Sequence, residues 1–221
     1  MTTLRTTALA LLASAATLAA GTALAQTTAA KPATCLVMGK EIPKAVDAAC
    51  PADVLATLRA YSWEVAVPKL DQDGKPVLDK DGLPATEKRR DGFTLMADML
   101  EAAGLTDHLT TGTVTVFAVP DSVLKEVVPA WTKALADEKL KAAATAAIAS
   151  HGIDEPLPRG WFTASNGQVW TLAGNYASGA KPISFHDLST AGFTINGVPV
   201  TRADIGAANG VIHMVARPLA M

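Results

Sequence analysis

The chain has 221 residues and a formal net charge of −2 at pH 7, from 19 lysines and arginines and 21 aspartates and glutamates. A near-neutral chain without a basic block is a poor match for nucleic acid or an anionic membrane surface, so we exclude both classes of partner. The length allows one sizeable domain together with additional segments.

The first 25 residues have the pattern of a signal peptide. Arg5 lies in a short n-region, residues 8–20 form an apolar run, and Ala23-Leu24-Ala25 supplies a small-x-small cleavage site before Gln26. A membrane anchor is the alternative, but the run is short for a span of roughly 20 residues and no charged stop-transfer cluster follows it. We therefore predict a periplasmic or secreted protein that begins at Gln26 and has no membrane span after cleavage.

Cys35 and Cys50 are the only cysteines. In an exported protein a disulfide is the default expectation, and this one would close a loop of about 15 residues, worth on the order of 3 kcal/mol. Two unpaired thiols are the alternative. A zinc site is a poor match, because two thiols without a nearby histidine do not complete a ligand set.

The segment that follows predicts a helix and then a strand. Val54, Leu55 and Leu58 stand at helical spacing behind Pro51, which favours a helix over residues 52–61. Residues 63–67 have the composition of a strand. Residues 87–90 (EKRR) are a charge run, for which we expect a solvated link.

The motif Asp-x-Asp-Gly occurs twice between these segments, at residues 71–74 and 79–82. A calcium-binding EF-hand loop needs acids at its first, third and fifth positions and glycine at the sixth. Here glycine directly follows the second aspartate, so the register is wrong. The sequence instead favours two Asp-Gly turns that join short strands.

From Asp91 onward the helix and strand signals are stronger. Phe93, Met96, Leu100 and Ala103 recur at helical spacing before Gly104, and Asp121 or Ser122 is expected to cap a helix after Pro120. The predicted elements are helix 93–103, strand 113–118, a helix from 121 or 122, helix 137–149, and strands 168–172, 182–186, 192–195, 198–200 and 209–216.

Two Asn-Gly pairs punctuate the C-terminal strands. Asn196-Gly197 lies between apolar runs and predicts a hairpin. Asn209-Gly210 predicts a second tight turn, because both residue types accept positive φ. The run behind it, residues 211–216, is apolar apart from His213, which predicts a closing strand buried on both faces.

The order of four stretches resembles the fasciclin domain. Its opening helix, first signature box, central strands and second signature box are matched by residues 93–105, 115–122 (TVFAVPDS), 171–174 with 193–197, and 204–213. The resemblance covers residues 91–219. It implies an α+β fold, a wedge-shaped β-sandwich or roll with helices packed on one side, plus an N-terminal extension.

The same resemblance predicts three parts: a signal peptide at 1–25, an extension at 26–90 and the fasciclin-like domain at 91–219. One reading places the family's first helix at residues 52–60, with 63–90 inserted after it. Seven positions are expected to be structural members of the family pattern: Thr115, Phe117, Asp121, His151, Asn209, Gly210 and His213. A Tyr-His pair linked to integrin binding in animal relatives is Ser150-His151 here, so an integrin-type role is not carried over.

The sequence predicts no catalytic residue, no cofactor and no metal site. The four histidines, His108, His151, His186 and His213, form no i, i+4 pair and no HExxH motif. For His213 we expect a core histidine hydrogen-bonded to backbone, and for His151 a helix end favoured by the helix dipole. A Gly-x-Ser-x-Gly nucleophile motif is also missing.

Trp161, Phe162 and Trp170 could form an aromatic platform for a sugar or a peptide, although such residues more often pack in the core. The resemblance implies a non-catalytic binding or adhesion module that recognises an extracellular or envelope protein or polysaccharide. The alternative is a hydrolase or metal-binding protein that uses His151 or His186 near the Pro-rich loop. A third possibility is a subunit of a secreted complex, docked through residues 63–90.

Overall fold

The computed structural model describes residues 34–37, 40–43, 51–163, 166–176, 180–188 and 192–219, and all of them belong to one unit, Pro32–Met221. The predicted signal peptide and Cys50 lie outside the described residues. Cleavage before Gln26, the Cys35–Cys50 disulfide and the division into three parts therefore stay predictions.

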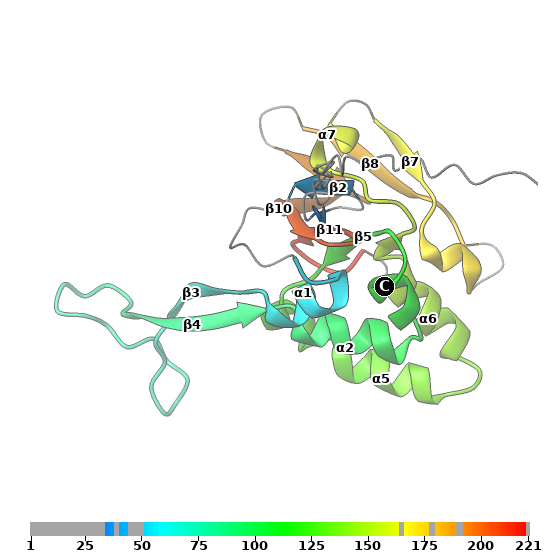
Figure 1. Ribbon diagram of the computed structural model, residues 1–221. Helices are drawn as coiled ribbons and strands as arrows, with labels where there is room; N and C mark the ends of the chain where they lie inside the picture. The colour runs from blue at the N-terminus through cyan, green and yellow to red at the C-terminus, as the bar shows by residue number, and fades with distance from the viewer. Residues whose placement is uncertain are drawn as a thin grey trace, which may run out of the picture. The chain divides into compact units, whose positions relative to one another are not determined.

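The described chain forms both helices and strands, with consecutive helices before β6 and consecutive strands at its C-terminal end (Figure 1). The helices are α1 (Val54–Ala60), α2 (Thr94–Ala102), α3 (Thr106–Thr110), α4 (Asp121–Leu124), α5 (Val128–Ala136), α6 (Lys141–Ala149), α7 (Arg159–Phe162) and the 3-10 helix η1 (Leu172–Asn175). The strands are β1 (Thr34–Val37), β2 (Lys40–Pro43), β3 (Ser62–Pro68), β4 (Thr86–Gly92), β5 (Val114–Ala118), β6 (Gly152–Ile153), β7 (Gly167–Val169), β8 (Ile183–Asp187), β9 (Phe193–Ile195), β10 (Val198–Ala207) and β11 (Gly210–Val215).

The closing strand β11 lies inside a seven-stranded sheet of order β6-β5-β11-β10-β9-β8-β7. It runs parallel to β5, in a register that joins Ile212 to Val116, and antiparallel to β10. All of its residues except Met214 are buried. The expected strand with two covered faces is thus confirmed, and the parallel pairing with β5 explains the apolar run, because parallel strands are covered on both faces.

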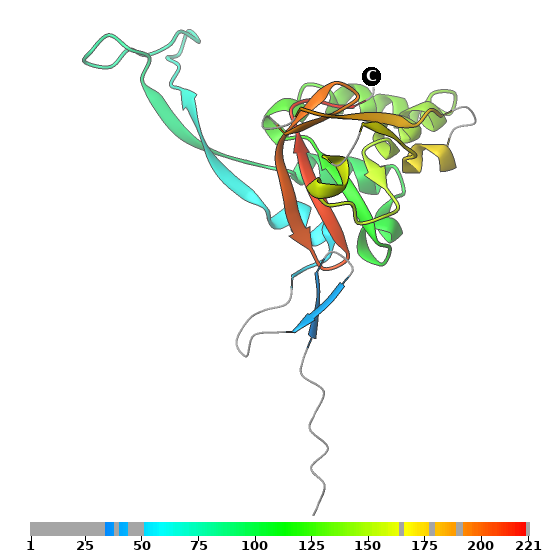
Figure 2. The ribbon, with the colours of Figure 1, turned by 90° about the horizontal axis from the view of Figure 1, so that it is seen from above.

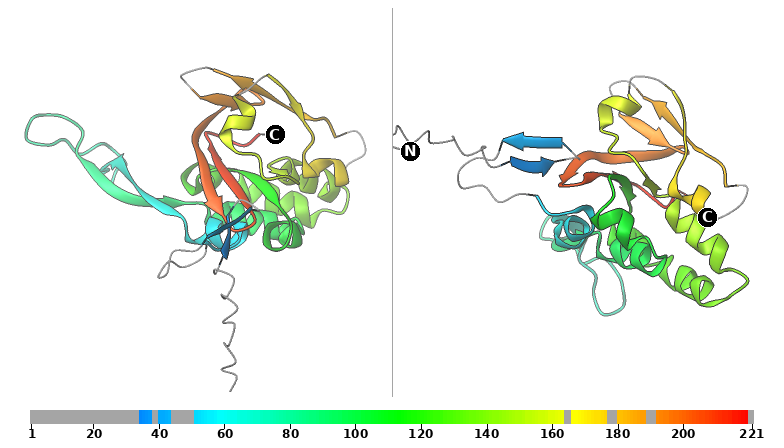
Figure 3. Two further views of the ribbon diagram at one scale, coloured as in Figure 1. Left: turned by 45° about the horizontal axis from the view of Figure 1, so that its top comes forward. Right: turned by 45° about the vertical axis from the view of Figure 1, so that its right-hand side comes forward.

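The helices gather on one side of β5 and β11. Figures 1 and 3 show α1, α2, α5 and α6 together on that side, while α7 lies beside β8. The largest fully buried side chains include Phe93, Phe117, Phe162, Phe193, Leu58 and Met96. Burying each such side chain contributes about 1.5–3 kcal/mol, so this one core dominates stability. The α+β class with helices on one side of a mixed sheet is confirmed.

A carboxylate at the start of α4 caps the N-terminus of α2, and a carboxylate just before α2 binds the start of α4. Asp121 accepts hydrogen bonds from the backbone N–H groups of Thr94 and Leu95, at 3.1 and 2.8 Å. Asp91 accepts from the backbone N–H and hydroxyl of Ser122, at 3.1 and 2.6 Å. The prediction that Asp121 or Ser122 caps its own helix was wrong, because the Asp121 carboxylate satisfies the free N–H groups of α2 instead.

Residues 62–92 form an arm that leaves the helices and the sheet (Figure 2). Strands β3 and β4 pair antiparallel over their full length. Residues 87–90, expected to be a solvated link, are therefore part of a strand. Their side chains are mostly exposed, so no apolar alternation marks the strand in the sequence.

Both Asp-Gly motifs at the end of the arm are turns, as expected. Asp71 accepts hydrogen bonds from the N–H groups of Asp73 and Lys75, and Asp79 does the same for residues 81 and 83. Gly74 and Gly82 both have a φ of 77°, which glycine adopts at little cost. Each carboxylate thus holds its own turn.

The two Asn-Gly pairs differ in their backbone conformation. Asn196 and Gly197 have positive φ values of 48° and 71° and join β9 to β10, which confirms the predicted hairpin. Neither Asn209 nor Gly210 has a positive φ, so the explanation offered for that turn was wrong. Gly210 is instead required by close approach, since a Cβ there would lie 2.0 Å from the carbonyl oxygen of Val114.

Candidate functional site

A cleft of about 460 Å³ opens between the loop after β6 and the segment from β7 to η1. Its polar and aromatic lining consists of Asp154, Glu155, Trp161, Gln168, Trp170, Thr171 and Asn175. Among the described residues that line it, none is basic. The cleft therefore combines aromatic faces for stacking with carboxylate and amide groups for hydrogen bonding.

Two tryptophans flank this cleft. Trp161 in α7 is 41% exposed, and Trp170 after β7 is 64% exposed. The Trp161 ring contacts Phe162 and Phe185, each with ring centroids 5.0 Å apart, so its position is fixed from beneath. Large apolar side chains held at the surface leave area to be covered by a partner.

Phe162 does not belong to this surface. It is fully buried, its ring stacks on Phe193 at 4.9 Å, and it meets the edge of Phe117 at 5.8 Å. The expected aromatic patch is therefore reduced to Trp161 and Trp170, because successive residues of a short helix point in different directions.

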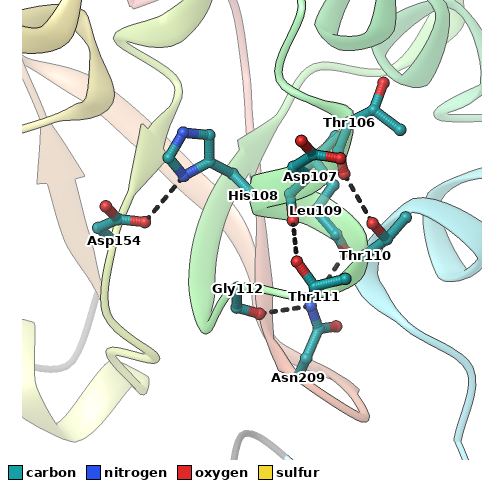
Figure 4. A network of polar contacts seen from close by, with 9 residues as sticks. All are labelled: Thr106, Asp107, His108, Leu109, Thr110, Thr111, Gly112, Asp154 and Asn209. Carbon is teal, nitrogen blue, oxygen red and sulfur yellow. Dashed lines mark hydrogen bonds and ion pairs between the residues drawn. The ribbon is translucent and has the colours of Figure 1, made fainter.

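A histidine contacts one of the carboxylates that line the cleft. His108 Nδ1 in α3 lies 3.1 Å from Oδ1 of Asp154, one of the lining carboxylates (Figure 4). The His108 side chain is 30% exposed and that of Asp154 is 58% exposed. The pair joins α3 to the loop after β6 and orients one carboxylate of the cleft.

The loop that carries the carboxylates is tied to β5 and β11. The Thr115 hydroxyl donates to the carbonyl of Glu155 at 2.6 Å and accepts from the N–H of Leu157 at 2.7 Å. His213 Nε2 donates to the carbonyl of Leu157 at 2.8 Å, while its Nδ1 accepts from the N–H of Asp204 at 3.2 Å. Burial is the main cause of a lowered pKa for His213, so the ring is neutral.

Asp204 fixes the helix that bears Trp161. Its φ is 61°, at a break in register between Arg202 and Ile205 in β10. Its Oδ1 accepts from the N–H of Arg159 at the start of α7, at 2.7 Å. A positive φ in a non-glycine residue is uncommon and costs energy. Here the bulge aims this carboxylate at the helix.

Asn209 joins three segments of the chain, and Figure 4 shows it beside Gly112 and α3. Its Nδ2 donates to the carbonyls of Leu109 and Gly112, at 3.0 and 2.6 Å, and its Oδ1 accepts from the N–H of Val54 at 2.8 Å. The residue thus connects α1, the end of α3 and the turn before β11. It holds in place the α3 segment from which His108 reaches Asp154.

His151 is wholly buried at the end of α6. Its Nδ1 donates to the carbonyls of Ala147 and Ile148, each at 3.2 Å, and its Nε2 accepts from the N–H of Leu219 at 3.0 Å. Burial lowers its pKa from 6.5 to about 4. The ring is therefore neutral at pH 7, and the attraction of a cation to the helix dipole does not explain the residue.

The alternative chemistry centred on His151 or His186 finds little support in this geometry. Both nitrogens of His151 are engaged with backbone and are closed to solvent. His186 is exposed on β8 and does not line the cleft. Across the described part of the chain, no three His, Cys, Asp or Glu side chains are grouped to hold a metal ion.

A model of the fasciclin domain family matches residues 91–221, more than half of the chain. The chain belongs to the fasciclin domain family. The resemblance found in the sequence is thereby confirmed. In this fasciclin domain Thr115 and His213 bind the loop after β6, at the carbonyls of Glu155 and Leu157.

One solved structure similar to this fasciclin protein is the FAS1 domain pair of the insect cell adhesion molecule fasciclin I. Sequence identity is 18%, the TM-score is 0.36, and the match covers 56% of this chain and 43% of that chain. The chain thus spans less than half of the length of that structure. No curated protein matches the present chain. Among the described helices, none is long and apolar enough to cross a membrane.

The polar residues of the cleft had no signal in the sequence. Asp154 lies in a loop, Gln168 in β7 and Asn175 in η1, and His108, which contacts Asp154, stands 46 positions away from it. Only the tryptophans could be singled out in advance, because large aromatic residues near turns are candidates for exposure. The polar lining becomes visible only when β6, β7 and α3 are placed side by side.

Proposed function

We propose that this fasciclin domain is an exported, non-catalytic binding module that recognises a polysaccharide of the envelope or extracellular matrix through the Trp161–Trp170 cleft. The observation that carries the proposal is the pair of exposed indole rings beside carboxylates and amides. A sugar ring offers an apolar C–H face to an indole and hydroxyl groups to polar side chains. Family membership supports a binding role, since fasciclin domains are associated with cell adhesion.

The charge of the cleft predicts the charge of the glycans that it binds. Asp154 and Glu155 are the charged residues of its described lining. They favour neutral sugars and sugars that carry an amino group, and they repel uronic acids and sulfated sugars. We therefore expect neutral or amino-sugar oligosaccharides to bind and anionic ones to be rejected.

Isothermal titration calorimetry with three oligosaccharide classes tests this function. Neutral β-glucan, glucosamine and uronate oligomers are titrated into the protein and into Trp170→Ala. Because Trp170 is exposed, the substitution is expected to leave the melting temperature almost unchanged. Loss of its stacking face is expected to weaken binding about tenfold or more.

Leu188→Ala, a truncation of another exposed apolar residue outside the cleft, is the matched control and is expected to bind like the unaltered protein. Equal affinity of Trp170→Ala and the unaltered protein would refute the cleft as the site. Release of shorter sugars during incubation would instead favour the hydrolase alternative. Binding of envelope proteins but of no oligosaccharide would replace the polysaccharide with a protein partner.

A further inference from the structure

The end of the arm is both apolar and acidic. Leu70, Leu78 and Leu83 are 52%, 59% and 63% exposed, and all three lie within residues 70–84. The same residues carry four aspartates and two lysines. We call residues 70–84 the arm tip. Its leucines contribute nothing to the core of their own chain, so they are available to a partner.

A groove at the foot of the arm is lined by three cations, Arg89, Arg90 and Lys125, and by two acids, Asp91 and Asp121. It has a volume of about 410 Å³, and Val65, Val67 and Leu95 form apolar parts of its wall. Arg90 and Lys125 stand at its edge, and both side chains are exposed. We call this the arm groove. Within the described residues, neither of these two cations has an ion-pair partner.

The acidic groups of the arm groove are already engaged. Asp91 is buried and bonded to Ser122, and Asp121 caps α2. Asp91 is buried and Asp121 is partly buried against α2, so the exposed Arg90 and Lys125 are the charges that an incoming partner reaches first. An acidic, leucine-bearing segment is complementary to this groove in both charge and polarity, and the arm tip is such a segment.

We propose that two copies of this chain associate through their arms, with the tip of each arm in the groove of the other. Two equal arms laid antiparallel place each tip opposite the partner's foot, so both contacts form at once. Such a reciprocal contact closes as a two-fold dimer. A lone two-stranded ribbon is marginally stable in water, and pairing with a second ribbon provides the missing packing.

Charge-reversal variants of the exported protein test the dimer, with the association state measured by sedimentation velocity. The tip-reversed variant is Asp73→Lys with Asp81→Lys, and the groove-reversed variant is Arg90→Glu with Lys125→Glu. We expect the unaltered protein to be a dimer and each variant alone to have a dissociation constant at least about tenfold higher. An equimolar mixture of the two variants restores opposite charges at both contacts and is expected to dimerise.

Lys133→Glu with Lys139→Glu makes the same charge change as the groove-reversed variant on exposed positions away from the arm, and it should dimerise normally. Leu78→Ser with Leu83→Ser removes two of the three exposed leucines of the tip without altering charge, and it should also weaken the dimer. A monomer at every concentration, reversed variants that dimerise normally, or a mixture that stays monomeric would each overturn the proposal. None of these outcomes depends on glycan binding by the cleft.

Discussion

His151 and His213 are held as opposite tautomers by their backbone partners. His151 carries its proton on Nδ1, which faces carbonyls, whereas His213 carries its proton on Nε2, which faces the carbonyl of Leu157. In each ring the other nitrogen accepts a backbone N–H. If either ring took up a second proton, its new N–H would face the backbone N–H that it now accepts from, and that hydrogen bond would be lost. Both residues are therefore structural connections between distant segments.

Replacement of His213 by leucine tests this assignment. His213→Leu leaves the N–H of Asp204 and the carbonyl of Leu157 without partners, so we expect the free energy of unfolding to fall by roughly 1–3 kcal/mol. Urea denaturation measures the change in the free energy of unfolding. For the control substitution His186→Leu, at an exposed position, this change should be near zero. Unchanged unfolding together with a lost activity would show that His213 is a working residue.

The stability of the protein should fall in mild acid. His151 has a folded pKa of about 4 against 6.5 in the unfolded chain. Below pH 6.5 the unfolded chain therefore binds the proton first, and stability is lost as the pH falls towards 4. The loss from this residue amounts to about 3 kcal/mol, and the lowered pKa of His213 adds in the same direction.

Urea denaturation between pH 7.5 and pH 4.5 measures this dependence. His151→Gln is expected to be less stable but to show a shallower slope with pH, because its side chain does not titrate. His186→Gln serves as the control and should keep the slope of the unaltered protein. A slope that His151→Gln leaves unchanged would assign the acid sensitivity to other groups.

At the scale of elements, most of the predicted helices and strands were found, but α3, α5 and α7 were missed, and the predicted strand 168–172 ends at Val169 because η1 begins at Leu172. Helix α5 was not predicted. Pro129 lies at the start of this helix, where its missing N–H costs nothing. Strand β4 was read as a link because its side chains face solvent. Exposure on both faces removes the period that sequence analysis relies on.

A substitution at Gly210 tests the close contact of β11 with β5. In Gly210→Ala the new Cβ would lie 2.0 Å from the carbonyl oxygen of Val114. Strands at the centre of the core cannot move apart freely, so we expect a loss of about 3 kcal/mol or more. Gly160→Ala, where a Cβ meets nothing within 4 Å, should be neutral or slightly stabilising. Equal melting temperatures for the two variants would contradict the tight pairing.

At the scale of the whole molecule, the fold was predictable and most of the candidate site was not. The order of the family motifs follows the chain, and so it can be read from the sequence. The cleft instead combines α3, α7 and the loops after β6 and β7, which meet only in space. The same holds for the arm groove, where β3 meets α2 and the start of α4.

The central claim is that the Trp161–Trp170 cleft binds a glycan, and the indole N–H resonances test it most directly. The chain has four tryptophans, of which Trp131 is nearly buried and Trp63 packs against Phe93 at the foot of the arm. In a titration with glucosamine oligomers followed by ¹⁵N–¹H spectra, the signals of Trp161 and Trp170 are expected to move while the other two stay in place. If Trp161 and Trp170 stay fixed while an oligosaccharide binds, the cleft is not the binding site.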